Sequence, residues 1–218
     1  MNKKSIENAI KELRKEEHKK KFSQSFDLIV NLKDLNLKNP DEQLDFFTVL
    51  SHSLGKKVKV AALVGPELHE KAKGVVDLII TQTEFDKYAA DKKLTKRIAT
   101  EYDFFIAQAD IMPKVAQVFG RVLGPRGKMP NPKLGSVLPG KGQVEPIYER
   151  LQKTVRISAK KSPIVQVKVG SESMKDEEIV ENIVLVYNQI IHHTPKEKSN
   201  IKNAMLKLTM SKPIKVDL

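Results

Sequence analysis

Between residues 57 and 123, short apolar segments alternate with longer amphipathic ones. The segments VKVAALVG, VVDLII and DFFIAQAD consist mainly of apolar residues, as strands buried on both faces do. Helical patterns follow them at residues 67–73, 84–100 and 112–123, the last with Asp110 as its expected N-cap. Strands that alternate with helices form a parallel sheet with helices on both faces. The middle of the chain is therefore predicted to be a small doubly wound α/β domain.

The N-terminal part begins with a helical pattern and continues with strand patterns. Residues 26–32 alternate between apolar and other side chains, which predicts a half-buried strand, and residues 46–50 predict a second one. Ser5 is the expected N-cap of the preceding helix. The apolar residues of that helix recur at the spacing of one face: Ile6, Ala9, Ile10 and Leu13.

The C-terminal part also mixes helices and strands. A helix is expected at 144–151, strands at 154–157 and 163–170, and a further alternating segment at 207–216. Ser173 and Asp176 predict a capping box at the start of a helix with apolar residues Ile179, Ile183, Val186 and Ile190. Both ends are thus predicted to form one discontinuous α+β domain, residues 1–54 and 155–218, with residues 55–154 inserted as the second domain.

Residues 124–142, GPRGKMPNPKLGSVLPGKG, combine five glycines and four prolines with four cationic side chains. Glycine permits close approach of a backbone to another molecule, and proline restricts the chain. Apolar residues such as Met129 and Leu134 argue against disorder. The segment is predicted to be a shaped cationic surface, and an ordinary connection in a basic protein is the alternative.

Composition favours a polyanionic partner. The 218 residues include 39 Lys and Arg against 27 Asp and Glu, a net charge of +12. Such a charge attracts nucleic acid. The alternative is a surface rich in lysine and glutamate that serves stability and solubility.

The chain lacks the residues that several classes of function require. The chain has no cysteine, and its five histidines show no metal-ligand spacing, so we expect neither disulfides nor a metal site. No apolar run approaches the roughly 18 residues of a membrane helix. The charged N-terminus lacks the apolar core of a signal peptide, which predicts a cytosolic protein.

One motif of nucleotide-binding enzymes is matched in part. Gly135, Gly140 and Lys141 fit the spacing G-x-x-x-x-G-K. Gly142 stands where that motif needs the hydroxyl that binds Mg²⁺, and no hydrophobic strand leads into Gly135. We therefore expect no catalytic residues and no cofactor.

Two further segments combine hydroxyl, apolar and basic side chains. They are KFSQSFD at 21–27 and LTMSKP at 208–213. Short hydroxyls bind ribose 2′-OH groups, an apolar side chain lies against a sugar or base, and lysine meets phosphate. The alternative is that Phe22 and Met210 are core residues.

Three segments resemble those of a known protein family: GRVLGPRGKMPNPKLG, VKVGSESM and LTMSKP. Over essentially its whole length the chain resembles the universal L-one family of ribosomal proteins of the large-subunit stalk, in its archaeal or eukaryotic-like form. The resemblance implies a sandwich domain I from both termini and an inserted Rossmann-like domain II. It also implies that domain I binds the L-one stalk of 23S-type rRNA, which moves with deacylated tRNA at the exit site, and that the protein represses its own mRNA.

The resemblance also implies site residues. The family's Thr-Met-Gly element falls on Thr209, Met210 and Ser211, so Ser211 replaces a glycine, and Ser171 stands where relatives have lysine. The expected RNA-binding residues are Lys21, Phe22, Ser25, Asp27, Lys168, Gly170, Ser171, Thr209, Met210, Ser211 and Lys212. A secondary contact with rRNA or tRNA is expected from Arg121, Arg126, Lys128 and Lys133.

The expected partners are large-subunit rRNA, exit-site tRNA, the leader of the protein's own mRNA and other ribosomal components. The protein is expected to be ribosome-associated in the cytoplasm and monomeric when free. Two alternatives belong to other classes: an enzyme that binds ATP with Mg²⁺, and a protein that compacts duplex DNA without sequence preference.

Overall fold

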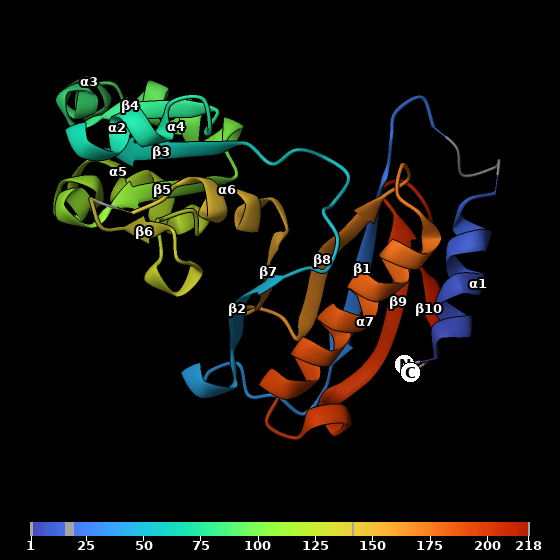
Figure 1. Ribbon diagram of the computed structural model, residues 1–218. Helices are drawn as coiled ribbons and strands as arrows, with labels where there is room; N and C mark the ends of the chain where they lie inside the picture. The colour runs from blue at the N-terminus through green and yellow to red at the C-terminus, as the bar shows by residue number, and fades with distance from the viewer. Residues whose placement is uncertain (1, 16–19, 141, 218) are drawn as a thin grey trace. The chain divides into compact units, whose positions relative to one another are not determined.

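A computed structural model describes residues 2–15, 20–140 and 142–217. Lys141, the lysine of the partial nucleotide-binding motif, lies outside the described residues. The chain separates into two compact units, with Met1–Lys56 and Lys153–Leu218 in unit 1 and Lys57–Gln152 in unit 2 (Figure 1).

Unit 1 contains a four-stranded antiparallel sheet in the order β10-β9-β1-β8. Helices α1 and α7 pack against this sheet (Figure 1), and β2 and β7 form a separate antiparallel pair. The elements are α1 Lys3–Leu13, β1 Ser25–Leu32, β2 Leu44–Val49, β7 Thr154–Ala159, β8 Ile164–Ser171, α7 Asp176–His193, β9 Ile201–Leu208 and β10 Ile214–Val216, with 3-10 turns at Pro40–Glu42 and Glu197–Asn200.

The predicted alternation along β1 is confirmed. Phe26, Leu28, Val30 and Leu32 are each at most 4% exposed and join one core with the buried faces of α1 and α7. The residues between them are half-buried. Because the side chains of a strand alternate between the two faces of a sheet, the opposite face of β1 presents Ser25, Asp27, Ile29 and Asn31.

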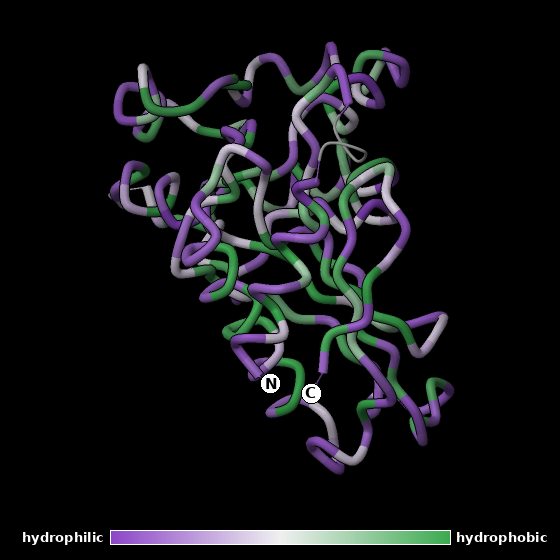
Figure 2. Tube along the Cα trace, turned by 90° about the vertical axis from the view of Figure 1, so that its right-hand side faces the viewer, coloured by the Kyte–Doolittle hydropathy of each residue, from purple (hydrophilic) through white to green (hydrophobic). Residues whose placement is uncertain are grey.

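The N-cap expected for the first helix is wrong. Asn2, not Ser5, caps α1, since its side-chain oxygen accepts a hydrogen bond from the Lys4 N–H. Ser5 lies inside the helix, and its hydroxyl accepts a hydrogen bond from the Asp217 N–H at 3.1 Å. This contact joins the two ends of the chain, which lie side by side in Figures 1 and 2.

The capping box expected at Ser173 is also wrong. Helix α7 begins at Asp176 after Lys175, whose N–H donates to the Glu178 carboxylate at 3.2 Å. The Ser173 hydroxyl instead shares a hydrogen bond with the Ser171 hydroxyl at 2.6 Å. The predicted apolar stripe of the helix, Ile179, Ile183, Val186 and Ile190, is buried as expected.

Unit 2 is a parallel sheet in the order β4-β3-β5-β6, which confirms the predicted α/β class. Strand β3 is buried along its whole length, as expected of a central parallel strand. The elements are β3 Val60–Val64, α2 Pro66–Ala72, β4 Leu78–Thr81, α3 Phe85–Ala90, α4 Lys92–Glu101, β5 Phe104–Gln108, α5 Met112–Arg126, β6 Val137–Leu138 and α6 Glu145–Gln152, with 3-10 turns at Gln82–Glu84, Ala109–Ile111 and Pro132–Leu134.

The helix expected at 84–100 is two helices. The side chain of Asp91 accepts hydrogen bonds from the N–H groups of Lys93 and Leu94, and so it caps α4 directly after α3 ends. A carboxylate at an N-cap satisfies donors that the helix itself leaves unpaired.

The next helix also differs from its expected bounds. Asp110 lies in a 3-10 turn and accepts a hydrogen bond from the Gln108 side chain, so it is not the N-cap of α5. Helix α5 continues to Arg126 and ends at Gly127, whose φ of 64° is the left-handed conformation that glycine adopts easily. The glycine- and proline-rich loop therefore begins three residues later than expected. No helix of residues 2–15, 20–140 and 142–217 has the length and apolar character needed to cross a membrane.

Candidate nucleic-acid interface

The two hydroxyl-bearing segments meet in unit 1. The start of β1 pairs with the end of β9, with Phe26 opposite Leu208. The Ser25 N–H donates to the Thr209 hydroxyl at 3.1 Å, and the two hydroxyls share a hydrogen bond of 3.1 Å. Residues 22–27 and 208–212 thus form one surface, which we call the unit 1 platform.

The buried side chain of Gln24 holds the two segments of the platform together. Its side chain is 1% exposed, and its carbonyl oxygen accepts a hydrogen bond from the Met210 N–H at 3.1 Å. Its backbone N–H and side-chain amide donate to the Glu172 carboxylate at 2.7 and 3.2 Å. Neither Gln24 nor Glu172 was predicted as a site residue, because the hydroxyls on either side of Gln24 carry the recognisable sequence signal.

Two apolar side chains stand on the surface of this platform. Phe22 is 51% exposed and Met210 is 64% exposed. The alternative that they are core residues is therefore wrong. Both side chains are therefore open to contact with another molecule.

Asp27 lies between two lysines on the half-buried face of the sheet. It pairs with Lys168 of β8 on one side and with Lys207 of β9 on the other. Burial raises the pKa of the Asp27 carboxyl, while Lys207, a hydrogen bond from Ser25 and Lys168 act in the opposite direction. Lys207, which was not predicted as a site residue, also donates to the Thr209 carbonyl at 3.0 Å. A band of alternating charge therefore borders the hydroxyl pair.

Ser211 closes the turn after β9. Its hydroxyl accepts a hydrogen bond from the Leu208 N–H at 2.8 Å. Within the described parts of the chain, Asp34 and Glu197 are the non-glycine residues with positive φ, so Ser211 does not adopt the left-handed conformation. A side chain at this position therefore costs no backbone strain, although the resemblance implies glycine here.

The other expected residues of unit 1 divide into two groups. Lys21 and Lys212 are exposed. Gly170 and Ser171 are buried, and a β-carbon at Gly170 would lie 3.0 Å from Ile179. Gly170 thus allows α7 to pack against β8. It is buried and is not part of the exposed platform.

Comparison with known proteins decides the family. The model of the ribosomal protein L1p/L10e family matches residues 13–212. Large ribosomal subunit protein uL1 of Methanothermococcus thermolithotrophicus is 41% identical over 217 residues, which cover 100% of both chains. The chain belongs to the ribosomal protein L1p/L10e family. This confirms the resemblance, and the role of the family is structural rather than enzymatic.

Other relatives show the same extent of similarity. The uL1 protein of Pyrococcus abyssi is 40% identical over 211 residues, which cover 97% of this chain and 94% of the relative. That of Nanoarchaeum equitans is 40% identical over 206 residues, or 93% and 95% of the two chains. Both units of the structure therefore belong to the region that the relatives share.

Arg14, which directly follows α1, holds the loop that carries Glu172. Its guanidinium donates to the carbonyls of Glu172 and Met174 at 2.8 and 2.6 Å and forms an ion pair with Asp176 at 2.8 Å. It also lies 5.5 Å from the centre of the Phe26 ring. This side chain, which was not predicted as a site residue, fixes the position of that loop.

The four cations expected to make the secondary contact do not act alike. Arg126 donates to the Thr100 hydroxyl at 2.7 Å, and Lys128 donates to the Tyr102 carbonyl at 2.7 Å. Burial lowers the pKa of Lys128. These two residues attach the end of α5 to the end of α4. Lys133 and Arg121 are exposed, the first in the loop and the second on α5.

Proposed function

We propose that this protein is a structural constituent of the large ribosomal subunit and that its unit 1 platform binds the L-one stalk of 23S-type rRNA. The observation that carries the proposal is the junction of Ser25 and Thr209, flanked by exposed Phe22 and Met210. The relatives named large ribosomal subunit protein support the ribosomal part. In this proposal residues 1–54 and 155–218 act as the RNA-binding domain I, and residues 55–154 as domain II.

The Thr209 hydroxyl is the proposed contact with ribose. A hydroxyl has one donor and two acceptor positions. Thr209 uses one acceptor position for the Ser25 N–H and shares one further bond with the Ser25 hydroxyl, which leaves capacity for a third bond. Because Ser25 and Gln24 hold this part of the chain, little entropy is lost when a 2′-OH binds.

The side chains around Thr209 complete the contact. Met210 and Phe22 lie against a sugar or base, and Lys21, Lys168 and Lys212 position the phosphates. Asp27 holds Lys168 and Lys207 beside them. Gly170 and Ser171 act indirectly, since they are buried on β8 beside the start of β1.

A filter-binding titration with a stalk RNA fragment tests the proposal. Thr209→Ala is expected to weaken binding about tenfold, the value of one lost hydrogen bond to ribose. Thr83→Ala in unit 2 removes an exposed hydroxyl of the same kind and serves as the control. Equal affinity of the Thr209 variant and the wild type would reject the platform as the binding site.

The proposal extends to exit-site tRNA movement and to repression of the protein's own mRNA. The stalk carries the protein during exit-site tRNA movement, and the same platform binds a similar element in the leader of its own mRNA and represses translation. The protein works as a monomer when free and is bound to cytoplasmic ribosomes with other ribosomal components. Competition between an rRNA stalk fragment and the mRNA leader tests the shared site, since two separate sites would give no competition.

The alternatives from other classes predict different binding. A DNA-compacting protein binds duplex DNA as tightly as the stalk RNA at about 0.2 M salt, where non-specific electrostatic binding is weak. A nucleotide-dependent enzyme binds ATP with Mg²⁺ in equilibrium dialysis. The proposal predicts a clear preference for the RNA and no retention of ATP.

A further inference from the structure

A groove on the surface of unit 2 is lined by cations. Lys92 and Lys96 of α4 and Arg121 of α5 line a hollow of about 450 Å³, together with Tyr88 and Gln117. A second hollow of about 470 Å³ runs along α4 and also includes Lys96. The second hollow is lined by Lys93, Lys96, Arg97, Thr100 and Glu101.

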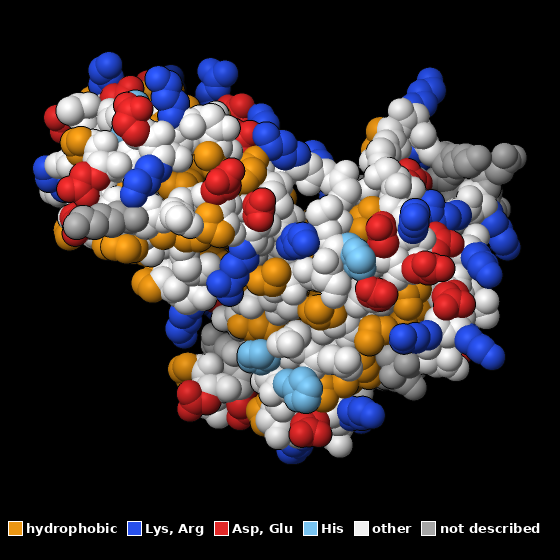
Figure 3. Space-filling model, viewed as in Figure 1, with side chains coloured by type: hydrophobic (Ala, Val, Ile, Leu, Met, Phe, Trp, Pro, Cys, Tyr) orange, Lys and Arg blue, Asp and Glu red, His pale blue; other side chains and the backbone are white. Residues whose placement is uncertain are grey.

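These hollows are two parts of one cationic surface, which we call the α4–α5 groove. Lys96 lines both, and Arg126 at the end of α5 donates to the Lys96 carbonyl and the Thr100 hydroxyl at 3.4 and 2.7 Å. In Figure 3, Lys and Arg side chains project along the edge of unit 2 at the top of the view, where Figure 1 places α3 and α4.

The charge pattern of α4 is unfavourable for the helix itself. Lys92 and Lys93 lie in its first turn, where the helix dipole disfavours cations, and its last turn has no basic residue. Lys92 with Lys96 and Lys93 with Arg97 are like-charge pairs four residues apart, which destabilise a helix by a few tenths of a kcal/mol each. A surface that served stability alone would carry acidic residues in this first turn.

Few carboxylates neutralise the groove. In the described part of the chain, no ion pair is formed by Lys92, Lys93, Lys96, Arg97 or Arg121. Glu101 pairs with Lys59 at 3.1 Å. Asp91 is hydrogen-bonded to the N-terminus of α4, which leaves Asp86 as the carboxylate in the lining of the first hollow.

We propose that the α4–α5 groove binds the phosphate backbone of RNA, as a second contact separate from the unit 1 platform. Its long cationic side chains complement a line of phosphates, whereas its floor, Val118, Val122 and Tyr88, contributes apolar contact. Binding therefore depends on charge rather than on base sequence. The proposal differs from a contact through the glycine- and proline-rich loop, because Lys128 of that loop is bonded internally.

Lysine labelling tests the groove directly. The full-length protein is treated with an acylating reagent, with and without an RNA hairpin of arbitrary sequence, and each lysine is quantified by mass spectrometry. RNA is expected to lower labelling of Lys92 and Lys96 at least about threefold, while Lys196 and Lys198 remain labelled. Equal labelling of Lys92 and Lys96 in both samples would overturn the proposal.

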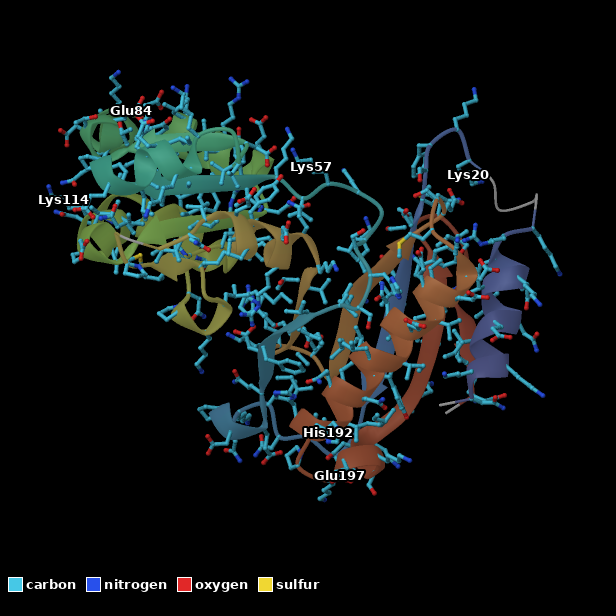
Figure 4. The ribbon with its side chains drawn as sticks, in the orientation of Figure 1. Lys20, Lys57, Glu84, Lys114, His192 and Glu197 are labelled. Atoms are coloured by element: carbon cyan, nitrogen blue, oxygen red, sulfur yellow. The ribbon has the colours of Figure 1, made fainter. Side chains whose placement is uncertain are left out.

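The control lysines lie far from the platform. They are part of or adjacent to the turn at Glu197–Asn200, at the start of β9, whereas Thr209 follows the end of that strand. Figure 4 shows Glu197 and Lys20 at opposite ends of unit 1. Labelling of Lys21, Lys207 and Lys212 with the stalk RNA reports on the platform, so failure of one site is distinguishable from failure of the other.

Charge reversal gives a second readout. Lys92→Glu combined with Lys96→Glu is expected to weaken binding of the arbitrary hairpin five- to tenfold. It should also reduce the slope of log affinity against log salt by about 1.5, the value of two lost phosphate contacts. The variant should keep its fold, because Glu in the first turn of α4 favours the helix. Lys196→Glu with Lys198→Glu changes the net charge equally, and an equal loss of affinity in both double variants would contradict a localised site.

Discussion

The unit 1 platform and the α4–α5 groove of unit 2 present different chemistry to a ligand. The platform exposes short side chains that are fixed by hydrogen bonds, as Thr209 is by Ser25 and the Met210 backbone is by buried Gln24. The groove exposes long cationic side chains that lack ion pairs among the described residues. A fixed hydroxyl selects a ribose in one position, whereas long lysine side chains accept any line of phosphates. The two proposals therefore imply that unit 1 provides specificity and unit 2 provides salt-dependent attraction.

The largest effect is expected from Gln24→Leu. Leucine keeps the volume but leaves the part-buried Met210 N–H and the part-buried Glu172 carboxylate without this partner. An unpaired buried group costs about 1–3 kcal/mol and a part-buried one less, so we expect unit 1 to lose about 1–2 kcal/mol of stability and stalk RNA binding to fall more than tenfold. Urea unfolding and filter binding measure the two effects.

Gln166→Leu is the matched control for Gln24→Leu. Gln166 is exposed on β8, so its loss should change neither quantity. If the Gln24 variant kept wild-type stability and affinity, the hydrogen bonds of Gln24 would not be needed to hold the platform.

Met210→Asp separates surface chemistry from stability. Because Met210 is 64% exposed, we expect unchanged unfolding and about tenfold weaker stalk RNA binding, from lost apolar contact and repulsion of phosphate. Ile164→Asp places the same charge on an exposed apolar position at the other end of β8 from Ser171. If both variants lost affinity equally, added negative charge alone would explain the result.

Asp77→Ala tests whether the two units work independently. Asp77 accepts a hydrogen bond from the Val60 N–H at 2.9 Å and pairs with Lys57 at 3.0 Å. We expect about 1–2 kcal/mol lower stability of unit 2, measured by amide hydrogen exchange of β3, and unchanged binding by the platform. A parallel loss of stalk RNA affinity would mean that the platform depends on unit 2.

The Asp77 effect should depend on pH with a defined sign. Although burial opposes it, hydrogen bonding to Val60 and the charge of Lys57 lower the pKa of this carboxyl in the folded protein. The folded state therefore holds the charged form more strongly than the unfolded state, and the stabilisation is complete above the unfolded pKa of about 3.8. It is lost as pH falls through the folded pKa, so wild type and variant should converge in acid.

Lys128→Met should have the smallest effect on RNA binding. Its ammonium group is bonded to the Tyr102 carbonyl, so we expect a stability loss of about 1 kcal/mol and less than a twofold change in affinity for any RNA. Arg121→Met in the groove is the contrasting variant, since it should lower affinity for an arbitrary hairpin without loss of stability. If Lys128→Met lowered the affinity for RNA and Arg121→Met did not, the secondary contact would lie in the glycine- and proline-rich loop and not in the groove.

Periodic features were predictable because burial imposes the same period on sequence and structure. The alternation along β1 and the continuous apolar segments of β3 and β5 placed both sheets. Local breaks were not predictable in this way. The pattern of 84–100 continues through Asp91, and only the carboxylate cap shows that a new helix begins there.

The candidate site was predictable only in part. The platform was indicated by hydroxyl, apolar and basic residues that lie close together in sequence near both termini, because these are the residue types that contact RNA. Gln24 and Arg14 act through partners more than 140 residues away along the chain, and no local pattern reports such contacts. Arg121 and Arg126 of the α4–α5 groove were predicted as contacts, whereas Lys92 and Lys96 match the ordinary solvated face of a helix until Arg121 is placed beside them.

The central claim is that a fixed hydroxyl on unit 1 recognises ribose in a folded RNA. The most direct test replaces one 2′-OH of the stalk fragment at a time by hydrogen and measures binding by the wild type and Thr209→Ala. The account predicts at least one position where the deoxy substitution weakens wild-type binding about tenfold and leaves the variant unaffected. Equal affinity of the wild type for every substituted fragment would contradict it.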